Sequence, residues 1–233
     1  MTTKMHKGPS AQTLLRVSGL AAMGAGLIFA GIQPVHPADV VGSVTTSPWA
    51  IILSLKFVMC LLMLVGITGI YLRQLGRIGW TGLAGFTVLI VCWLLQSGYI
   101  FTELFILPKL ALVAPDFVDS LLTMARGGQA TVDIGVVAPT YLIVGLLYLL
   151  GGLTFGIAIF RAGVLPRWAG LLWVATALVT PAAALLPHAI QRYAAVPMGI
   201  TLIWLGVALW TERRSIAADI GEVTTQVRVA TAK

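Results

Sequence analysis

Charged side chains are scarce in this sequence. They make up 10% of the 233 residues, whereas hydrophobic residues make up 58%. A soluble domain carries about 25% charged residues, which it needs in order to cover a surface that faces water. Apolar stretches instead suit the hydrocarbon of a bilayer. We therefore predict an integral membrane protein, with the lipid bilayer as its surroundings.

Cysteines and catalytic motifs are scarce as well. The two cysteines, Cys60 and Cys92, lie in apolar runs and form no redox or metal-binding motif, so we interpret them as packing residues. The sequence contains no H-E-x-x-H, no G-x-S-x-G and no phosphate-binding loop. Zinc peptidases, serine hydrolases and P-loop enzymes are therefore not indicated. We predict neither a cofactor nor a metal, and the sequence leaves open whether the protein is an enzyme.

Long apolar runs are what the sequence does have. A helix needs about 20 apolar residues to cross ~30 Å of hydrocarbon. Runs of this length predict an all-α transmembrane bundle of six spans, over residues 14–32, 49–72, 80–105, 136–160, 168–186 and 196–210. We predict one transmembrane domain over residues 1–211 and a flexible cytoplasmic tail over residues 212–233.

The first run needs a decision between a signal peptide and a retained helix. Lys4 and Lys7 precede it, as in a signal peptide. However, Arg16 interrupts the start of the run, and no small-residue cleavage site follows it. We therefore favour a retained first helix.

The basic residues predict an orientation. With the N-terminus inside, eleven Lys and Arg residues fall on the inner side, and three, Lys109, Arg126 and Arg192, fall on the outer side. Cytoplasmic loops carry such an excess of positive charge. We predict a multi-pass protein of a bacterial inner membrane with both termini in the cytoplasm. The basic residues are scattered over helix ends, so the net charge of +7 does not indicate a nucleic-acid partner.

The outer connection between the third and fourth runs contains an amphipathic segment. In "APDFVDSLLTMARGG", Asp116 is expected to cap a helix that Gly127 ends. Phe117, Leu121 and Leu122 gather on one face of this helix. The pattern predicts a short helix on the outer surface, either a lid over the bundle or an interfacial connector, and we favour the connector.

One charge lies inside an apolar run. Lys56 follows Trp49 by seven residues, which places it about 10 Å along a helix that rises 1.5 Å per residue. A charge at this depth is costly unless it reaches the headgroups or finds a partner. In the third run, Gln96, Tyr99 and Glu103 share one helical face. Neighbouring antiparallel helices are expected to bring Lys56 and Glu103 within reach of each other.

Other polar residues fall at the same outer level of the bundle. His36 follows the first run, Asp133 precedes the fourth, His188 follows the fifth, and Arg192 and Tyr193 precede the sixth. Their distribution predicts a pocket that is open to the outer side. Its predicted ligand-binding residues are Lys56, Gln96, Tyr99, Glu103, Asp133 and His188.

Several functions remain open at this point. The leading hypothesis is binding or transport of a small amphiphile or lipid through this pocket. The second is an accessory or structural membrane protein, in which Lys56 reaches the headgroups or holds two helices in register. The third is a membrane-embedded isomerase or cyclase that uses Glu103 and Asp133 as acid and base. His36 and His188 as ligands of a haem or a metal are a further alternative.

Two stretches resemble a known family. They are "TTSPWAIILSLKFVMCLLMLVGITGIYLRQ" and "FRAGVLPRWAGLLWVATALV". An "SPW" start to the second helix and an "LPRW" start to the fifth resemble uncharacterised bacterial multi-pass proteins of a domain-of-unknown-function family, the DUF4386-like group. The resemblance covers most of the membrane region. It implies a membrane-spanning topology and assigns no activity and no site residue. The oligomeric state is not indicated.

Overall fold

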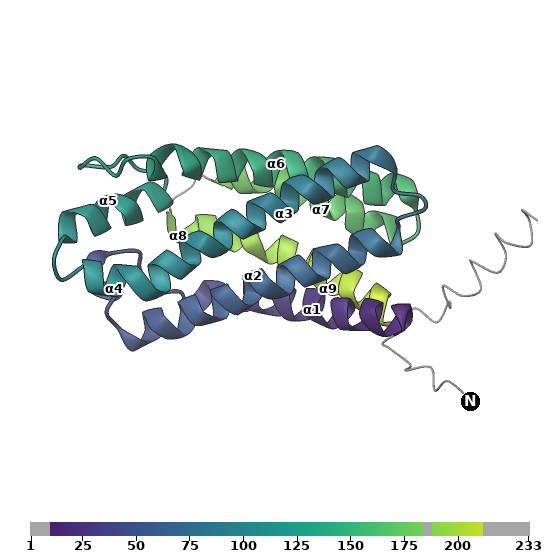
Figure 1. The fold of residues 1–233 in the computed structure, drawn as a ribbon, viewed down its shortest axis with the longest axis horizontal. Coiled ribbons are helices and arrows are strands. Elements are labelled where there is room, and N and C mark those ends of the chain that lie inside the picture. The colour runs from purple at the N-terminus through teal and green to yellow at the C-terminus, as the bar shows by residue number, and fades with distance from the viewer. Residues whose placement is uncertain (1–9, 184–187, 212–233) are drawn as a thin grey trace, which may run out of the picture.

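The computed structural model describes residues 10–183 and 188–211, and within these ranges every regular element is a helix (Figure 1). The predicted tail, residues 212–233, lies outside the described residues. The long helices are α1 (Ala11–Gly31), α2 (Ser47–Arg73), α3 (Gly79–Phe101), α6 (Val137–Ala162), α7 (Arg167–Ala183) and α9 (Ala195–Thr211). The short elements are η1 (Gln33–Val35), η2 (Val41–Ser43), η3 (Thr102–Ile106), α4 (Leu107–Leu110), α5 (Pro115–Ala125), α8 (His188–Gln191) and η4 (Arg192–Ala194).

The six long helices form a closed ring. Helix α1 packs between α9 and α2, α3 packs between α2 and α6, and α7 packs between α6 and α9. The turns between α2 and α3 and between α6 and α7 lie at one end of the ring, together with the start of α1 (Figure 1). We call this the turn end. Helices α4, α5 and α8 lie at the opposite end, which we call the α5 end.

Glycine allows the helices of the ring to approach closely. A methyl group at Gly156 of α6 would lie 2.8 Å from the carbonyl oxygen of Gly170 on α7, and a methyl group at Gly170 would lie as close to the Gly156 carbonyl oxygen. Neither position has space for a side chain, and small residues of this kind let helix backbones meet in a membrane. Helix α6 ends at Gly163, which has a φ of 61° that glycine adopts without strain.

Five helical segments of the described chain are long and apolar enough to cross a membrane. They match five of the six predicted spans, with bounds of 11–35, 47–73, 79–110, 137–162 and 192–211. The third segment is longer than predicted, because η3 and α4 follow α3 without a break. These segments confirm that the chain has the helices of a membrane protein.

The predicted fifth span is the exception. Helix α7 occupies Arg167–Ala183 and is 17 residues long. The predicted span continues to residue 186, and residues 184–187 lie outside the described part of the chain. Six spans therefore stay a prediction.

A helix does occupy the connection between α3 and α6, with one correction to its predicted start. Helix α5 covers Pro115–Ala125, and Ala114 is its N-cap. Asp116 lies in the first turn, where its negative charge complements the helix dipole, and it does not cap the helix. Gly127 follows the helix with a φ of 80°. Val118 and Leu122 are fully buried, so α5 packs against the bundle through one apolar face.

Candidate functional site

A cavity of about 770 Å³ lies among the helices of the ring and extends towards the α5 end. This volume is within the ~300–1,000 Å³ that is typical of small-molecule sites. Residues from α1, α2, α3, α6 and α7 line it, together with the segments around Arg126 and Arg192. We call it the central cavity. Four of the six predicted ligand-binding residues line it, namely Lys56, Gln96, Tyr99 and Glu103.

The lining of the central cavity changes from charged to apolar along the helix axes. Near the α5 end the lining residues include Asp39, Lys56 and Glu103. Deeper in the bundle they include Met59 and Trp93. Along η3 and α3 the lining runs from Glu103 to Cys92, eleven residues or about 16 Å of helix. The cavity is therefore polar at one end and apolar at the other.

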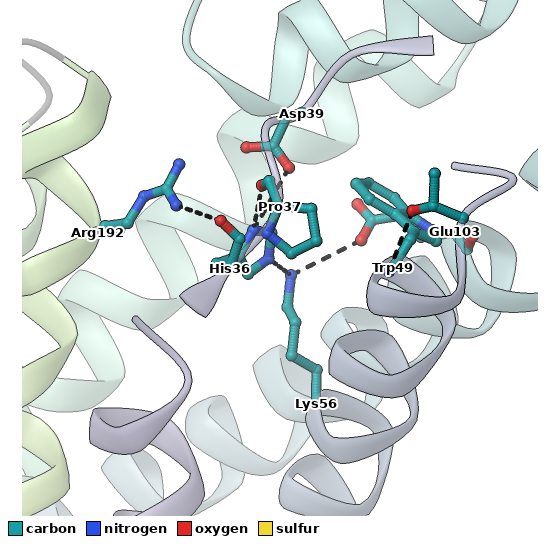
Figure 2. Close-up of polar contacts among 8 residues, drawn as sticks. His36, Pro37, Asp39, Trp49, Lys56, Glu103 and Arg192 are labelled. Carbon is teal, nitrogen blue, oxygen red and sulfur yellow. Dashed lines mark hydrogen bonds and ion pairs between the residues drawn. The ribbon is translucent and has the colours of Figure 1, made fainter. Parts of the chain in front are cut away.

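Lys56 occupies the polar end because of its place on α2. Side chains on a helix lean towards the helix N-terminus, and the N-terminus of α2 is at the α5 end. The Lys56 ammonium consequently reaches out of the apolar layer towards Glu103 and His36 (Figure 2). Lys56 Nζ lies 3.8 Å from Glu103 Oε2, and the two side chains are 22% and 16% exposed. The expected proximity of Lys56 and Glu103 is confirmed.

Glu103 is held in place through its backbone. It lies in η3, a π-helical turn in which the Leu107 N–H donates to the carbonyl of Thr102. In this register the Glu103 carbonyl would accept from residue 108, which is proline and has no N–H. The indole N–H of Trp49 donates to this carbonyl instead, at 3.1 Å. Trp49 is 1% exposed, so the bond is shielded from water and fixes α3 against the start of α2.

His36 completes the polar end, and its contacts define its tautomer. His36 Nδ1 lies 2.8 Å from the Pro37 carbonyl, which can only accept, so Nδ1 carries the proton. The unprotonated Nε2 then accepts from Lys56 Nζ at 3.5 Å. Burial, and then the Lys56 charge, lower the His36 pKa below its ordinary 6.5. Asp39 Oδ1 lies 4.0 Å from Nδ1, and Arg192 donates to the His36 carbonyl at 2.9 Å.

Tyr99 and Gln96 also line the cavity, as their shared face with Glu103 predicted. The Tyr99 hydroxyl donates to the Thr140 hydroxyl, whose own proton goes to the Val137 carbonyl at 2.7 Å. The Tyr99 ring stacks on Tyr141 of α6 with centroids 4.7 Å apart. These contacts hold α3 against α6 beside the cavity.

The other two predicted site residues are not placed with this group. Asp133 is exposed, its carboxylate accepts from the Gly135 N–H at 2.7 Å, and it is not among the cavity-lining residues. The proposed pairing of Glu103 and Asp133 as acid and base has no geometric support. His188 begins α8, and its side chain lies outside the part of the structure that is described.

The sequence did not predict four residues of the site, one of which is Asp39, beside His36 in the cavity lining. Trp49 was read as a helix start, whereas its indole holds the Glu103 carbonyl. Tyr141 lines the cavity, and so does Arg126, for which the sequence indicated only a place on the outer side. Among the described residues, no three His, Cys, Asp or Glu side chains come together as a metal ion would require.

Comparison of the sequence with protein-family models, with curated proteins and with solved structures finds no match. The resemblance to the DUF4386-like proteins therefore stays a prediction.

Proposed function

We propose that the protein binds a small amphiphile or lipid in the central cavity. The observation that carries this proposal is the gradient of its lining, from Lys56 and Glu103 at the α5 end to Trp93 in the interior. The ~16 Å between Glu103 and Cys92 is about half of the ~30 Å hydrocarbon thickness of a bilayer. This is the depth of one leaflet, and hence the length that an acyl chain occupies beside the protein.

The cavity also reaches the surface that would face lipid. Leu142 and Leu146 of α6 line it and are 67% and 48% exposed. Gly145 lies between them in the lining, and a methyl group added there meets no atom within 4 Å. A ligand is therefore expected to enter sideways from the bilayer, past α6.

The membrane placement is part of the same proposal. We infer six spans, with α7 as the fifth, in a bacterial inner membrane with both termini in the cytoplasm. Trp80, Trp168 and Trp210 lie near helix ends at the turn end and are 85%, 68% and 42% exposed, as in the aromatic belt at a membrane surface. The described basic residues of the turn end, among them Arg77 and Arg161, support this side as the cytoplasmic one. A C-terminal fluorescent fusion that fails to fluoresce in cells while a periplasmic reporter is active there would contradict it.

Photochemical labelling tests the binding proposal. Purified protein is irradiated with a photoactivatable fatty acid, and the labelled peptides are mapped by mass spectrometry. We expect labels on α3 and α6 residues of the central cavity. Gly145→Phe fills open space in the cavity and should abolish them, whereas Gly98→Phe, at an open position of α3 outside the cavity, should leave them. Labels spread evenly over lipid-facing residues, and equal in both variants, would refute the proposal.

A further inference from the structure

The charged residues that line the central cavity indicate which kind of polar head group a ligand would have. Among the described residues, five charged ones line it: three cations, Lys56, Arg126 and Arg192, and two anions, Asp39 and Glu103. His36, whose Nε2 accepts from Lys56, is neutral in this arrangement. The polar end of the cavity consequently has one positive charge more than it has negative charges.

The ammonium of Lys56 has room for a better acceptor. It has three N–H donors. Its contacts with His36 Nε2 and Glu103 Oε2 are 3.5 and 3.8 Å long, whereas N–H···O bonds are typically about 2.7–3.2 Å. An anionic oxygen in the cavity is able to approach Nζ more closely than either neighbour does.

Two arginines, Arg126 and Arg192, line the same cavity from other elements. Arg126 follows α5, and its Nη2 donates to the Thr123 hydroxyl at 2.8 Å. Arg192 lies in η4 and donates through Nη1 to the His36 carbonyl at 2.9 Å. Each of these contacts uses one of five N–H donors and leaves the planar fork suited to a carboxylate or a phosphate. The two arginines come from separate segments, and the fold brings both to the wall of one cavity.

We infer that the ligand is a single-chain amphiphile with an anionic head, a carboxylate or a phosphate, which Lys56, Arg126 and Arg192 recognise. This inference rests on the proposed function, because it places the acyl chain of the ligand in the apolar part of the cavity. A free fatty acid and a single-chain phospholipid share this chemistry.

Calorimetric titration in a mild non-ionic detergent tests the inference with four C16 amphiphiles. Palmitate and palmitoyl lysophosphatidic acid have anionic heads, hexadecanol is neutral, and hexadecyltrimethylammonium is cationic. We expect at least one of the anionic amphiphiles to bind about tenfold or more tightly than the neutral and cationic ones, the effect of one charge-assisted hydrogen bond. Binding of palmitate alone, or of the phosphate lipid alone, supports the inference and identifies the source.

Arg126→Gln is the matching variant, and Lys109→Gln is its control, because Lys109 is an exposed cation of the α5 end outside the cavity. We expect Arg126→Gln to reduce the anion preference about tenfold and Lys109→Gln to leave it unchanged. If Arg126→Gln does not fold, the four-probe comparison on the unaltered chain decides. If neither palmitate nor the lysophosphatidic acid binds more tightly than hexadecanol, the inference is overturned and the proposed function stands, whereas absence of binding by all four overturns both.

Discussion

The ammonium of Lys56 on α2 lies 3.8 Å from the carboxylate of Glu103 in the π-helical turn after α3. Both side chains line the central cavity and are less than a quarter exposed. The pair therefore joins two neighbouring helical segments at the polar end of the cavity. Both groups are close enough to the cavity to contact a ligand.

Lys56→Met leaves the Glu103 carboxylate without its cation. We expect a loss of about 1–3 kcal/mol in stability, the cost of leaving a buried polar group without a partner. Thermal unfolding in detergent measures it, with Lys109→Met as the control. The double variant Lys56→Met/Glu103→Leu should recover most of the loss, because it also removes the uncompensated charge. If Lys56→Met alone is as stable as the unaltered protein, the pair is well solvated and has no structural role.

Trp49→Phe removes the indole donor and keeps the ring. The Glu103 carbonyl, which Pro108 leaves without a helical donor, then has no partner, and we expect a loss of about 1–3 kcal/mol. Trp80→Phe, at a position 85% exposed, is the control for the ring change. Pro108→Ala restores an N–H to the helix and should rescue part of the loss in the Trp49→Phe background. If the changes in unfolding free energy caused by Trp49→Phe and Pro108→Ala simply add in the double variant, the Trp49–Glu103 hydrogen bond and the missing N–H of Pro108 are unrelated.

The His36 site makes stability depend on pH. Because burial and Lys56 lower its folded pKa below 6.5, the unfolded chain takes up a proton at this site first as the pH falls. The contribution of His36 to the free energy of unfolding is present above pH 6.5, and it is lost as the pH falls from 6.5 through the pKa of His36 in the folded protein. We expect the Tm to fall between pH 7.5 and 5.5 by more in the unaltered protein than in His36→Gln. Equal slopes would show that burial, Lys56 and Arg192 do not disfavour the imidazolium beyond what the carboxylates of Asp39 and Glu103 offset.

Gly156→Leu tests the close packing of α6 on α7. The side chain would meet the Gly170 carbonyl and Val174, each within 3 Å of the added Cβ, so we expect a loss of about 1–3 kcal/mol. Gly31→Leu is the control, because a Cβ at Gly31 has no atom within 4 Å. Equal Tm values for the two variants would contradict the packing of these helices.

The sequence predicted those parts of the fold and the site that follow from periodicity and hydropathy. Five long apolar helices, the shared face of Gln96, Tyr99 and Glu103, and the reach of Lys56 to Glu103 all follow from spacing along a helix. The hydrogen-bond donor to the Glu103 carbonyl was harder to predict from the sequence. Pro108, five residues after Glu103, was a signal that a carbonyl would lack a donor, but no spacing rule indicates that Trp49 supplies it.

The positions of Asp133 and Arg126 relative to the cavity likewise do not follow from spacing or hydropathy. Asp133 precedes α6 at the expected level, yet it forms a local turn with Gly135, which hydropathy does not distinguish from a position facing the cavity. Arg126 lies in a connection whose path depends on how α5 packs against the bundle. Its place in the cavity wall follows from tertiary contacts, which the pattern of one chain does not encode.

Native mass spectrometry of the protein, purified in a mild detergent, tests the central claim most directly. If the central cavity holds an amphiphile, the unaltered protein and Gly98→Phe should each retain one discrete additional mass per chain. Gly145→Phe, folded by the same thermal criterion, should not retain it. A bare chain in every mild detergent, or the same mass retained by Gly145→Phe, would contradict the account and leave Lys56 and Glu103 as a structural pair.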